Sequence, residues 1–191
     1  MCILSDVDIL RELKTANLVI RPIDLEKQIG PCSVDLRMGN EALVLDRKKM
    51  VLNNRALFKM EDDIEPYMER IVLENSLVIQ PGENVLITNM EWIEIPNNIR
   101  GRIEGRSSLA RRFLEVHSTG GFVDSGFCGK ITLEVTNKLN IPQELKVGER
   151  VCQLELSYLA HPCEKPYSGK YKGQKSVTPS KLHLDFPKKV L

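Results

Sequence analysis

The sequence lacks the features that mark secreted, membrane-spanning or metal-cluster proteins. Its five cysteines are an odd number and form no C-x-x-C pair, which argues against both a disulfide framework and a thiolate metal cluster. Apolar runs are only a handful of residues long, and the N-terminus shows no basic segment followed by an apolar one, so neither a transmembrane span nor a signal peptide is expected. We therefore expect a protein of the reducing cytoplasm.

Net charge is also nearly absent, because 27 Lys and Arg balance 26 Asp and Glu. No field of the whole molecule draws it onto nucleic acid or an anionic membrane, so neither is expected as a partner. Any polyanion must be held by a local basic cluster. With 42% hydrophobic and 28% charged residues, a chain of 191 residues is long enough for one domain with a sizeable core.

The hydrophobic periodicity predicts a mainly β fold after one short N-terminal helix. Ser5 or Asp6 is the expected helix cap, and Ile9 and Leu13 follow at helical spacing. From residue 34 the period becomes two, and from residue 76 strand-length segments alternate with turns, which is typical of a barrel or a double-sheet sandwich. Residues 53–75 are interpreted as a loop, a brief helix and the start of a strand.

The C-terminal end differs in composition from the rest. Residues 161–191 are rich in Lys and Pro and have few large apolar side chains, which predicts an extended tail. Residues 1–160 are accordingly assigned to the β-barrel domain with its helix.

The densest polar segment is GRIEGRSSLARR at residues 101–112. Ser107 and Ser108 precede a helix-compatible stretch, so their hydroxyl and backbone N–H groups would stand at a helix N-terminus, where a phosphate is favoured. Arg106 and Arg111 would add charge-assisted hydrogen bonds. The alternative is a capped surface helix with solvated arginines. The spacing is not that of a Walker phosphate-binding loop.

A second polar segment covers residues 117–137. Its glycines allow the backbone to approach a ligand, and Asp124 lies between two turn-forming pairs. In the strand that follows, Thr132 and Glu134 share the face opposite the apolar residues, and Glu134 is a candidate acid or base if it is buried or beside a pocket. The alternative is a solvated carboxylate. His117 is interpreted as a packed or hydrogen-bonded strand residue rather than a metal ligand.

Zinc-dependent deamination is not supported, because the H-x-E and P-C-x-x-C motifs of zinc deaminases are missing.

The tail offers Tyr167 and Tyr171 among several lysines on a glycine-flanked segment. Such a segment can fold over an anionic aromatic ligand and exclude water. The alternative is a solvated basic tail.

Taken in order along the chain, these segments resemble the dCTP deaminase group of the trimeric dUTPase superfamily. The motifs that carry the resemblance are ILSDVDIL (3–10), CSVDLRMG (32–39), EGRSSLAR (104–111), VDSGF (123–127), TLE (132–134), VCQL (151–154) and KYKGQ (170–174). The resemblance implies a distorted jelly-roll or β-barrel that forms a homotrimer, with active sites between subunits. It further implies Mg²⁺ carried by the nucleotide triphosphate, and no zinc.

By the same resemblance, Glu134 is the general acid and base that takes a proton from the water attacking C4 of cytosine. Asp124 contacts the deoxyribose and is the candidate for activating water in a second, dUTP-cleaving step. The implied substrate-binding residues are Arg106, Ser107, Ser108, Leu109, Ala110, Arg111, Asp124, Thr132, Leu133, Gln153, Tyr167, Lys170 and Gln174.

Two segments favour the bifunctional type within this group, which converts dCTP to dUMP and pyrophosphate and so supplies dUMP for dTTP synthesis. TGGF at residues 119–122 is similar to its T-A-G-[FW] segment, and KYKGQ is similar to its K-Y-Q-G-Q. Ser125 stands where Pro is usual, and Gly120 where Ala is usual. The alternatives are a dUTP diphosphatase only, or a non-catalytic nucleotide-binding jelly-roll module, which an ion-paired Glu134 remote from any pocket would indicate.

Overall fold

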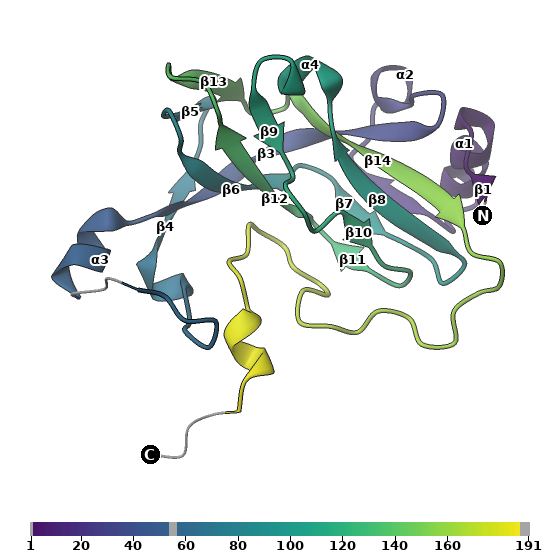
Figure 1. The fold of residues 1–191 in the computed structure, drawn as a ribbon. Helices are drawn as coiled ribbons and strands as arrows, with labels where there is room; N and C mark the ends of the chain where they lie inside the picture. The colour runs from purple at the N-terminus through teal and green to yellow at the C-terminus, as the bar shows by residue number, and fades with distance from the viewer. Residues whose placement is uncertain (1, 54–56, 188–191) are drawn as a thin grey trace.

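The computed structural model describes residues 2–53 and 57–187 (Figure 1). Helix α1 (Asp6–Lys14) begins at the expected cap. The Ser5 hydroxyl accepts a hydrogen bond from the backbone N–H of Asp8, and the Asp8 carboxylate accepts one from the backbone N–H of Ser5. This reciprocal capping box satisfies two N–H groups that a helix end leaves free, and Ile9 on the inner face of the helix is fully buried. The predicted N-terminal helix is confirmed.

Antiparallel strands are the main regular elements of the chain. In chain order the strands are β1 (Cys2–Ile3), β2 (Val19–Arg21), β3 (Ser33–Leu45), β4 (Met68–Val72), β5 (Ser76–Ile79), β6 (Asn84–Asn89), β7 (Trp92–Glu94), β8 (Ile99–Gly105), β9 (Leu114–Val116), β10 (Phe122–Val123), β11 (Cys128–Gly129), β12 (Thr132–Asn137), β13 (Gln143–Lys146) and β14 (Arg150–Tyr158). The short helical elements besides α1 are α2 (Leu25–Gln28), α3 (Arg47–Leu52), η1 (Glu65–Tyr67), α4 (Ser107–Ala110) and η2 (Leu182–Asp185). None of the helices described is long and apolar enough to cross a membrane.

The largest sheet has the strand order β10-β8-β14-β3-β6-β12-β9, with β1 added on β14 and β4 on β3. Strand β3 is shared between two halves of this sheet, because its first part pairs with β14 and its second part with β6 and β4. The pairing of β3 with β6 shifts register between Met38 and Ala42, and such irregularities bend a sheet. The sheet curls accordingly, and the predicted mainly β, barrel-like fold is confirmed (Figure 1).

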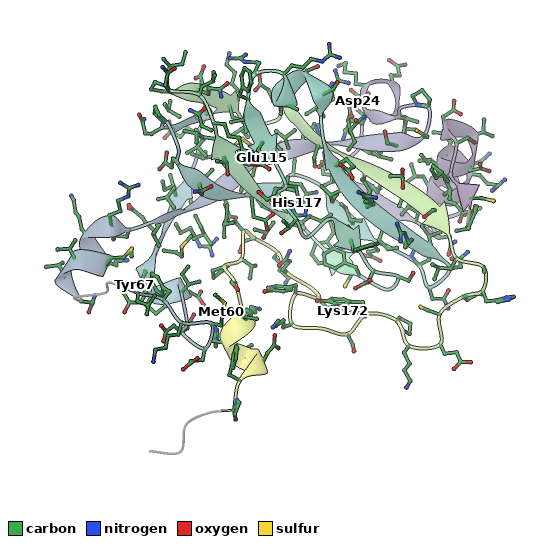
Figure 2. All side chains as sticks on the ribbon, in the orientation of Figure 1. Asp24, Met60, Tyr67, Glu115, His117 and Lys172 are labelled. Atoms are coloured by element: carbon green, nitrogen blue, oxygen red, sulfur yellow. The ribbon has the colours of Figure 1, made fainter. Side chains whose placement is uncertain are left out.

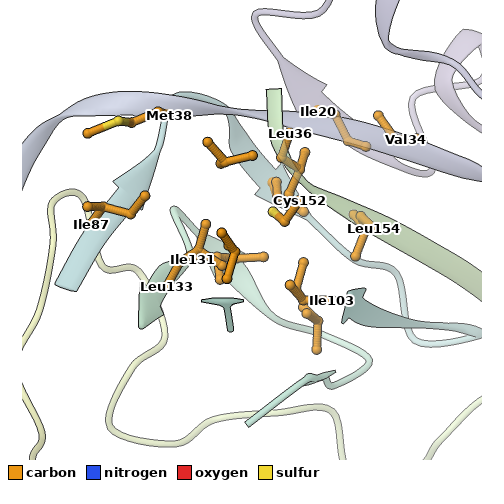
Figure 3. Packing of buried hydrophobic residues seen from close by; sticks show 14 of the residues in the cluster. Ile20, Val34, Leu36, Met38, Ile87, Ile103, Ile131, Leu133, Cys152 and Leu154 are labelled. Atoms are coloured by element: carbon orange, nitrogen blue, oxygen red, sulfur yellow. The ribbon is translucent and has the colours of Figure 1, made fainter. Parts of the chain in front are cut away.

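The core follows from alternation along the strands. Ile131, Leu133 and Val135 are buried on one face of the β12 segment, as the period of two predicts. Figure 3 shows Leu133 close to Ile131 and, across the core, Leu36 and Cys152 on β3 and β14. Burial strongly raises the pKa of the Cys152 thiol, so this cysteine is a packing residue and not a reactive one.

An arm extends from the barrel where β3 and β4 run beyond the main sheet (Figure 1). Strand β4 pairs with residues 41–45 of β3, and α3 and η1 occupy the connection between the two strands. Residues 57–75 contain the brief helix and the strand expected from the sequence, whereas residues 54–56 lie outside the described chain.

Residues 167–178 of the C-terminal segment lie against the barrel. Gly129 and Gln174 form a parallel bridge, in which the backbone N–H of Lys130 donates to the Gln174 carbonyl at 2.9 Å. Val177 is fully buried, and the Arg70 guanidinium on β4 donates to its carbonyl at 3.0 Å. The interpretation of this segment as a solvated basic tail is therefore wrong for residues 167–178.

Candidate active site

A cavity of about 890 Å³ lies between the barrel and the C-terminal segment. The barrel contributes Asp124, Thr132 and Glu134, and the C-terminal segment contributes Tyr167 and Gln174. The far wall is apolar and comes partly from the arm, through Leu45, Ile64 and Met68. Five of the expected site residues are thus brought together within one chain.

Glu134 reaches this cavity from β12, between Leu133 and Val135, which are fully buried. Its side chain is 46% exposed, and its Oε2 atom lies 2.7 Å from Nδ1 of His117, whose side chain is only 5% exposed. The two atoms are close, but neither has a hydrogen-bond partner among the described residues. Glu134 is therefore neither a freely solvated carboxylate nor remote from a pocket.

The two groups shift each other's ionisation. Burial alone raises the pKa of Glu134, but the His117 imidazole outweighs it and holds that pKa below its ordinary value of 4.5. Burial alone lowers the pKa of His117, but the Glu134 carboxylate and the Gly120 backbone hold it above its ordinary value of 6.5. The pair thus favours an ionised Glu134, which is the form that accepts a proton.

The sequence did not single out His117 as a partner of Glu134. It follows directly after β9, its backbone N–H donates to the Glu134 carbonyl at 2.8 Å, and its φ of 67° is rare for a residue other than glycine. Figure 2 shows His117 at the centre of the molecule, between the barrel strands and the C-terminal segment. Knowledge of the pairing of β9 with β12 would have identified His117 as the neighbour of Glu134, because this pairing places Val116 opposite Val135.

Asp124 lies in the turn that follows β10. Its carbonyl accepts a hydrogen bond from the N–H of Phe127 at 3.0 Å, and Gly126 within the turn has a φ of 86°. The Ser125 hydroxyl donates to the Ile99 carbonyl at 2.6 Å and is buried. Serine at this position therefore fastens the Asp124 turn to β8 through its side chain.

The C-terminal segment closes the other side of the cavity with specific contacts. The N–H of Thr178 donates to the Thr132 hydroxyl at 3.0 Å, and the Gln174 amide nitrogen donates to the Lys130 carbonyl at 2.6 Å. The other amide atom of Gln174, Oε1, is buried with no hydrogen-bond partner among the described residues. The Tyr167 ring lies 6.1 Å from that of Phe127, which also lines the cavity.

The expected phosphate-binding residues lie elsewhere. Helix α4 is at the end of β9 opposite to His117, and none of its residues lines the cavity (Figure 1). Its members and flanking residues are Arg106, Ser107, Ser108, Leu109, Ala110 and Arg111. The Arg106 guanidinium donates to the Arg150 carbonyl at 3.1 Å and lies 3.5 Å from the Asp35 carboxylate.

Three further expected residues also lie outside the cavity lining. The Gln153 amide on β14 donates to the Ser33 hydroxyl at 3.3 Å. The Leu133 side chain faces the core, which leaves only its backbone for a ligand. Lys170 is paired with Asp185 at 2.6 Å.

No three His, Cys, Asp or Glu side chains in residues 2–53 and 57–187 are grouped so that they could hold a metal ion. The protein groups at the cavity are suited to binding a nucleotide, with two carboxylates, hydroxyl groups and two tyrosine rings.

The fold and the site define a β-barrel domain with two carboxylates, Asp124 and Glu134, in a cavity beneath its own C-terminal segment. The sequence profile described as dCTP deaminase-like matches residues 3–159. The chain therefore belongs to the dCTP deaminase family.

Individual relatives agree over nearly the full length. The chain is 43% identical over 195 residues to the dUMP-forming dCTP deaminase of Dictyoglomus thermophilum, covering 98% of each chain. It is 40% identical to the dUMP-forming dCTP deaminase of Methanopyrus kandleri, covering 97% of this chain and 98% of the other. The crystal structure of the 2′-deoxycytidine 5′-triphosphate deaminase of Agrobacterium tumefaciens superposes with a TM-score of 0.62 at 20% identity, over 80% of this chain and 47% of that longer one. The last comparison supports the fold alone.

Proposed function

We propose that this protein deaminates dCTP by zinc-independent hydrolysis and continues to dUMP and pyrophosphate. The observation that carries the proposal is the placement of Glu134 on the wall of a nucleotide-sized cavity, where His117 keeps it ionised. The names of the relatives support the same activity. Such an enzyme is a hydrolase acting on a cyclic amidine, in pyrimidine deoxynucleotide metabolism.

In the first step water adds to C4 of the cytosine. Glu134 accepts one proton from this water as the C–O bond forms and delivers it to N3. It then accepts the second proton from the new C4 hydroxyl and delivers it to the leaving amine. The C–N bond breaks, and dUTP and ammonia result. General acid and base catalysis of this kind supplies about 10²–10⁴ in rate, so orientation of the substrate must supply the rest. The C-terminal segment, which covers the cavity, supports that orientation and excludes water.

In the second step water attacks the α-phosphorus of dUTP, and dUMP and pyrophosphate are released. Asp124 is the group we assign to activating this water, since it lines the same cavity as Glu134. Both steps then use one bound nucleotide. The relatives named as dUMP-forming, together with the TGGF segment at residues 119–122, support this second activity.

The phosphates are assigned to α4 of a second copy of the chain. Within one chain, α4 and the cavity lie at opposite ends of β9, so Ser107, Ser108 and Arg111 do not line the cavity that holds Glu134. A homotrimer with its sites between subunits resolves this separation, because each copy then supplies α4 to its neighbour. Mg²⁺ enters with the triphosphate and neutralises part of its charge. The free cysteines are consistent with a cytoplasmic location.

The alternatives are weaker. A dUTP diphosphatase does not need Glu134 as a general base, whereas here this residue is held ionised beside the cavity. A non-catalytic binding module would leave Glu134 ion-paired and away from any pocket, and only the first of these two conditions holds.

Incubation of the protein with dCTP and Mg²⁺, followed by chromatography of the nucleotides and an ammonia assay, tests the proposal. Equal amounts of dUMP, pyrophosphate and ammonia are expected. Release of dUTP alone would remove the second step. Hydrolysis of added dUTP without any deamination of dCTP would favour the diphosphatase.

A further inference from the structure

The tail lysine expected to bind nucleotide is paired with a carboxylate of the same chain. Lys170 Nζ lies 2.6 Å from Asp185 Oδ2, a separation typical of a close charge-assisted hydrogen bond. Lys170 is 25% exposed and Asp185 is 59% exposed, so the carboxylate lies on the solvent side of the pair. Lys170 belongs to the KYKGQ motif, whereas Asp185 lies beyond it at the end of η2.

The surrounding contacts hold the two charges in this arrangement. The Lys181 ammonium donates to the Lys170 carbonyl at 3.0 Å, and the Lys181 backbone N–H donates to the Tyr171 hydroxyl at 3.0 Å. The segment carrying Asp185 is thus fastened to the turn that carries Lys170. Tyr167 and Tyr171, on either side of Lys170 in the sequence, line the cavity, although Lys170 itself does not.

We propose that Asp185 is an internal anion that competes with the nucleotide phosphates for Lys170. This inference rests on the proposed function for the identity of the incoming anion. The ammonium cannot keep its close contact with Asp185 while it moves to a phosphate at the cavity, so binding requires that the pair opens. Asp185 therefore determines how much negative charge a ligand needs in order to displace it from Lys170.

Substrate and product differ in this respect. A triphosphate offers several charged oxygens along an extended chain and displaces Asp185. A monophosphate lacks the β- and γ-phosphates, so Asp185 recovers Lys170 when dUMP is formed. The contact thus favours capture of the triphosphate and departure of the monophosphate.

The expected effect of removing Asp185 on polyphosphate binding follows from the proposal that the Lys170–Asp185 contact is broken when the ligand binds. An interaction present only in the empty protein opposes ligand binding, and its removal shifts the population toward the bound state. Exposed ion pairs contribute about 0.2–1 kcal/mol, which corresponds to about 1.5- to 5-fold in a dissociation constant. Asp185→Asn should therefore tighten the binding of a polyphosphate by this factor.

Calorimetric titration of Asp185→Asn in a Glu134→Gln background, which prevents turnover, measures the effect with dCTP, inorganic triphosphate and deoxycytidine as separate ligands. We expect tighter binding of dCTP and inorganic triphosphate and unchanged binding of deoxycytidine. Glu115→Gln is the matched control, because Glu115 pairs with Lys138 at the same 2.6 Å but does not line the cavity. In a Lys170→Ala background, Asp185→Asn should have no effect on any ligand.

Limited trypsin digestion of the ligand-free protein gives a second readout. Asp185→Asn should be cleaved in its C-terminal segment faster than wild type, with the barrel left intact. Weaker or unchanged polyphosphate binding, an effect that survives Lys170→Ala, or unchanged cleavage would overturn the proposal. Failure of the proposed function is seen separately, as absence of ammonia from wild-type protein and dCTP, whereas the inorganic triphosphate and trypsin experiments require no deamination.

Discussion

His117, directly after β9, lies beside Glu134 of the adjacent strand β12, with 2.7 Å between Nδ1 and Oε2. One partner is almost completely buried and the other faces the cavity, so the histidine sets the charge of a carboxylate that remains accessible to a ligand. The acidity of the proposed catalytic group is therefore controlled from within the barrel.

Glu134→Gln keeps the size and most hydrogen bonds of the side chain but removes its ability to accept a proton. Ammonia release from dCTP should fall by at least about 10²-fold while dCTP binding persists. A coupled ammonia assay and calorimetry measure the two quantities. Glu115→Gln, on the neighbouring strand, should keep wild-type activity. Near-normal turnover by Glu134→Gln would remove this residue from the mechanism.

His117→Asn tests the control of Glu134, and asparagine is chosen because it tolerates the left-handed backbone found at this position. Without the imidazole, burial dominates and the pKa of Glu134 rises. The acid limb of the kcat/KM profile should therefore move to higher pH than in wild type. A profile with the same acid limb in both proteins would show that His117 does not set this ionisation.

The same pair predicts a pH window for stability. The raised pKa of His117 means that its contribution is complete below pH 6.5 and is lost as pH rises through the folded-state value. The lowered pKa of Glu134 means that its contribution is complete above pH 4.5 and is lost as pH falls through the folded-state value. The difference in unfolding free energy between wild type and His117→Asn should be largest between these two values, as measured by urea titration at about pH 5.5 and about pH 9. A difference that grows toward the alkaline end would contradict the assignment.

Mixed oligomers test the proposed sharing of sites. Glu134→Gln and Arg111→Ala should each be nearly inactive alone. After joint refolding in equal amounts, about one quarter of the sites should combine an intact Glu134 with an intact α4 from the neighbouring copy. A steady-state assay should therefore recover about a quarter of wild-type activity. If both groups acted within one chain, the mixture would stay as inactive as its components.

Truncation after Pro166 removes the segment that covers the cavity. Because Val177 is fully buried, its loss should lower Tm by about 3–10 °C rather than leave it unchanged. Activity should fall by about 10²-fold or more, since orientation of the substrate is lost. Calorimetry and the ammonia assay measure these effects. Full turnover of dCTP by the truncated protein would exclude a role for the segment.

Gly129→Ala adds one Cβ atom where the C-terminal segment packs against the barrel, and so tests that packing. A Cβ atom there would lie 2.9 Å from the Gln174 carbonyl oxygen, and the φ of 139° is also unfavourable for alanine. We expect faster proteolysis of the C-terminal segment and reduced activity. Gly82→Ala is the control for a positive φ without a clash, because Gly82 has a φ of 69° and a Cβ added there would meet no atom within 4 Å. Equal effects of the two variants would mean that contact with Gln174 is unimportant.

The fold could be predicted well because its signals are local. Ser5 and Asp8 mark a helix start within four residues, and alternation of apolar side chains around Leu133 marks a strand. The partner of Glu134 could not be predicted in this way, since β10 and β11 lie between His117 and Glu134 in the sequence and the two become neighbours only when β9 pairs with β12. Composition also misjudged the C-terminal segment, because two buried residues, Val177 and Pro179, and a few backbone hydrogen bonds suffice to fasten it.

The C-terminal segment belongs to the same chain as the cavity it covers. Its closure over the cavity is therefore an intramolecular step. A tethered segment closes at an effective concentration set by its own length, which does not change on dilution of the protein. Helix α4, when supplied by another copy, is available only while the copies remain associated. Dilution therefore separates the two halves of the proposed site, since it removes phosphate contacts but leaves the cover in place.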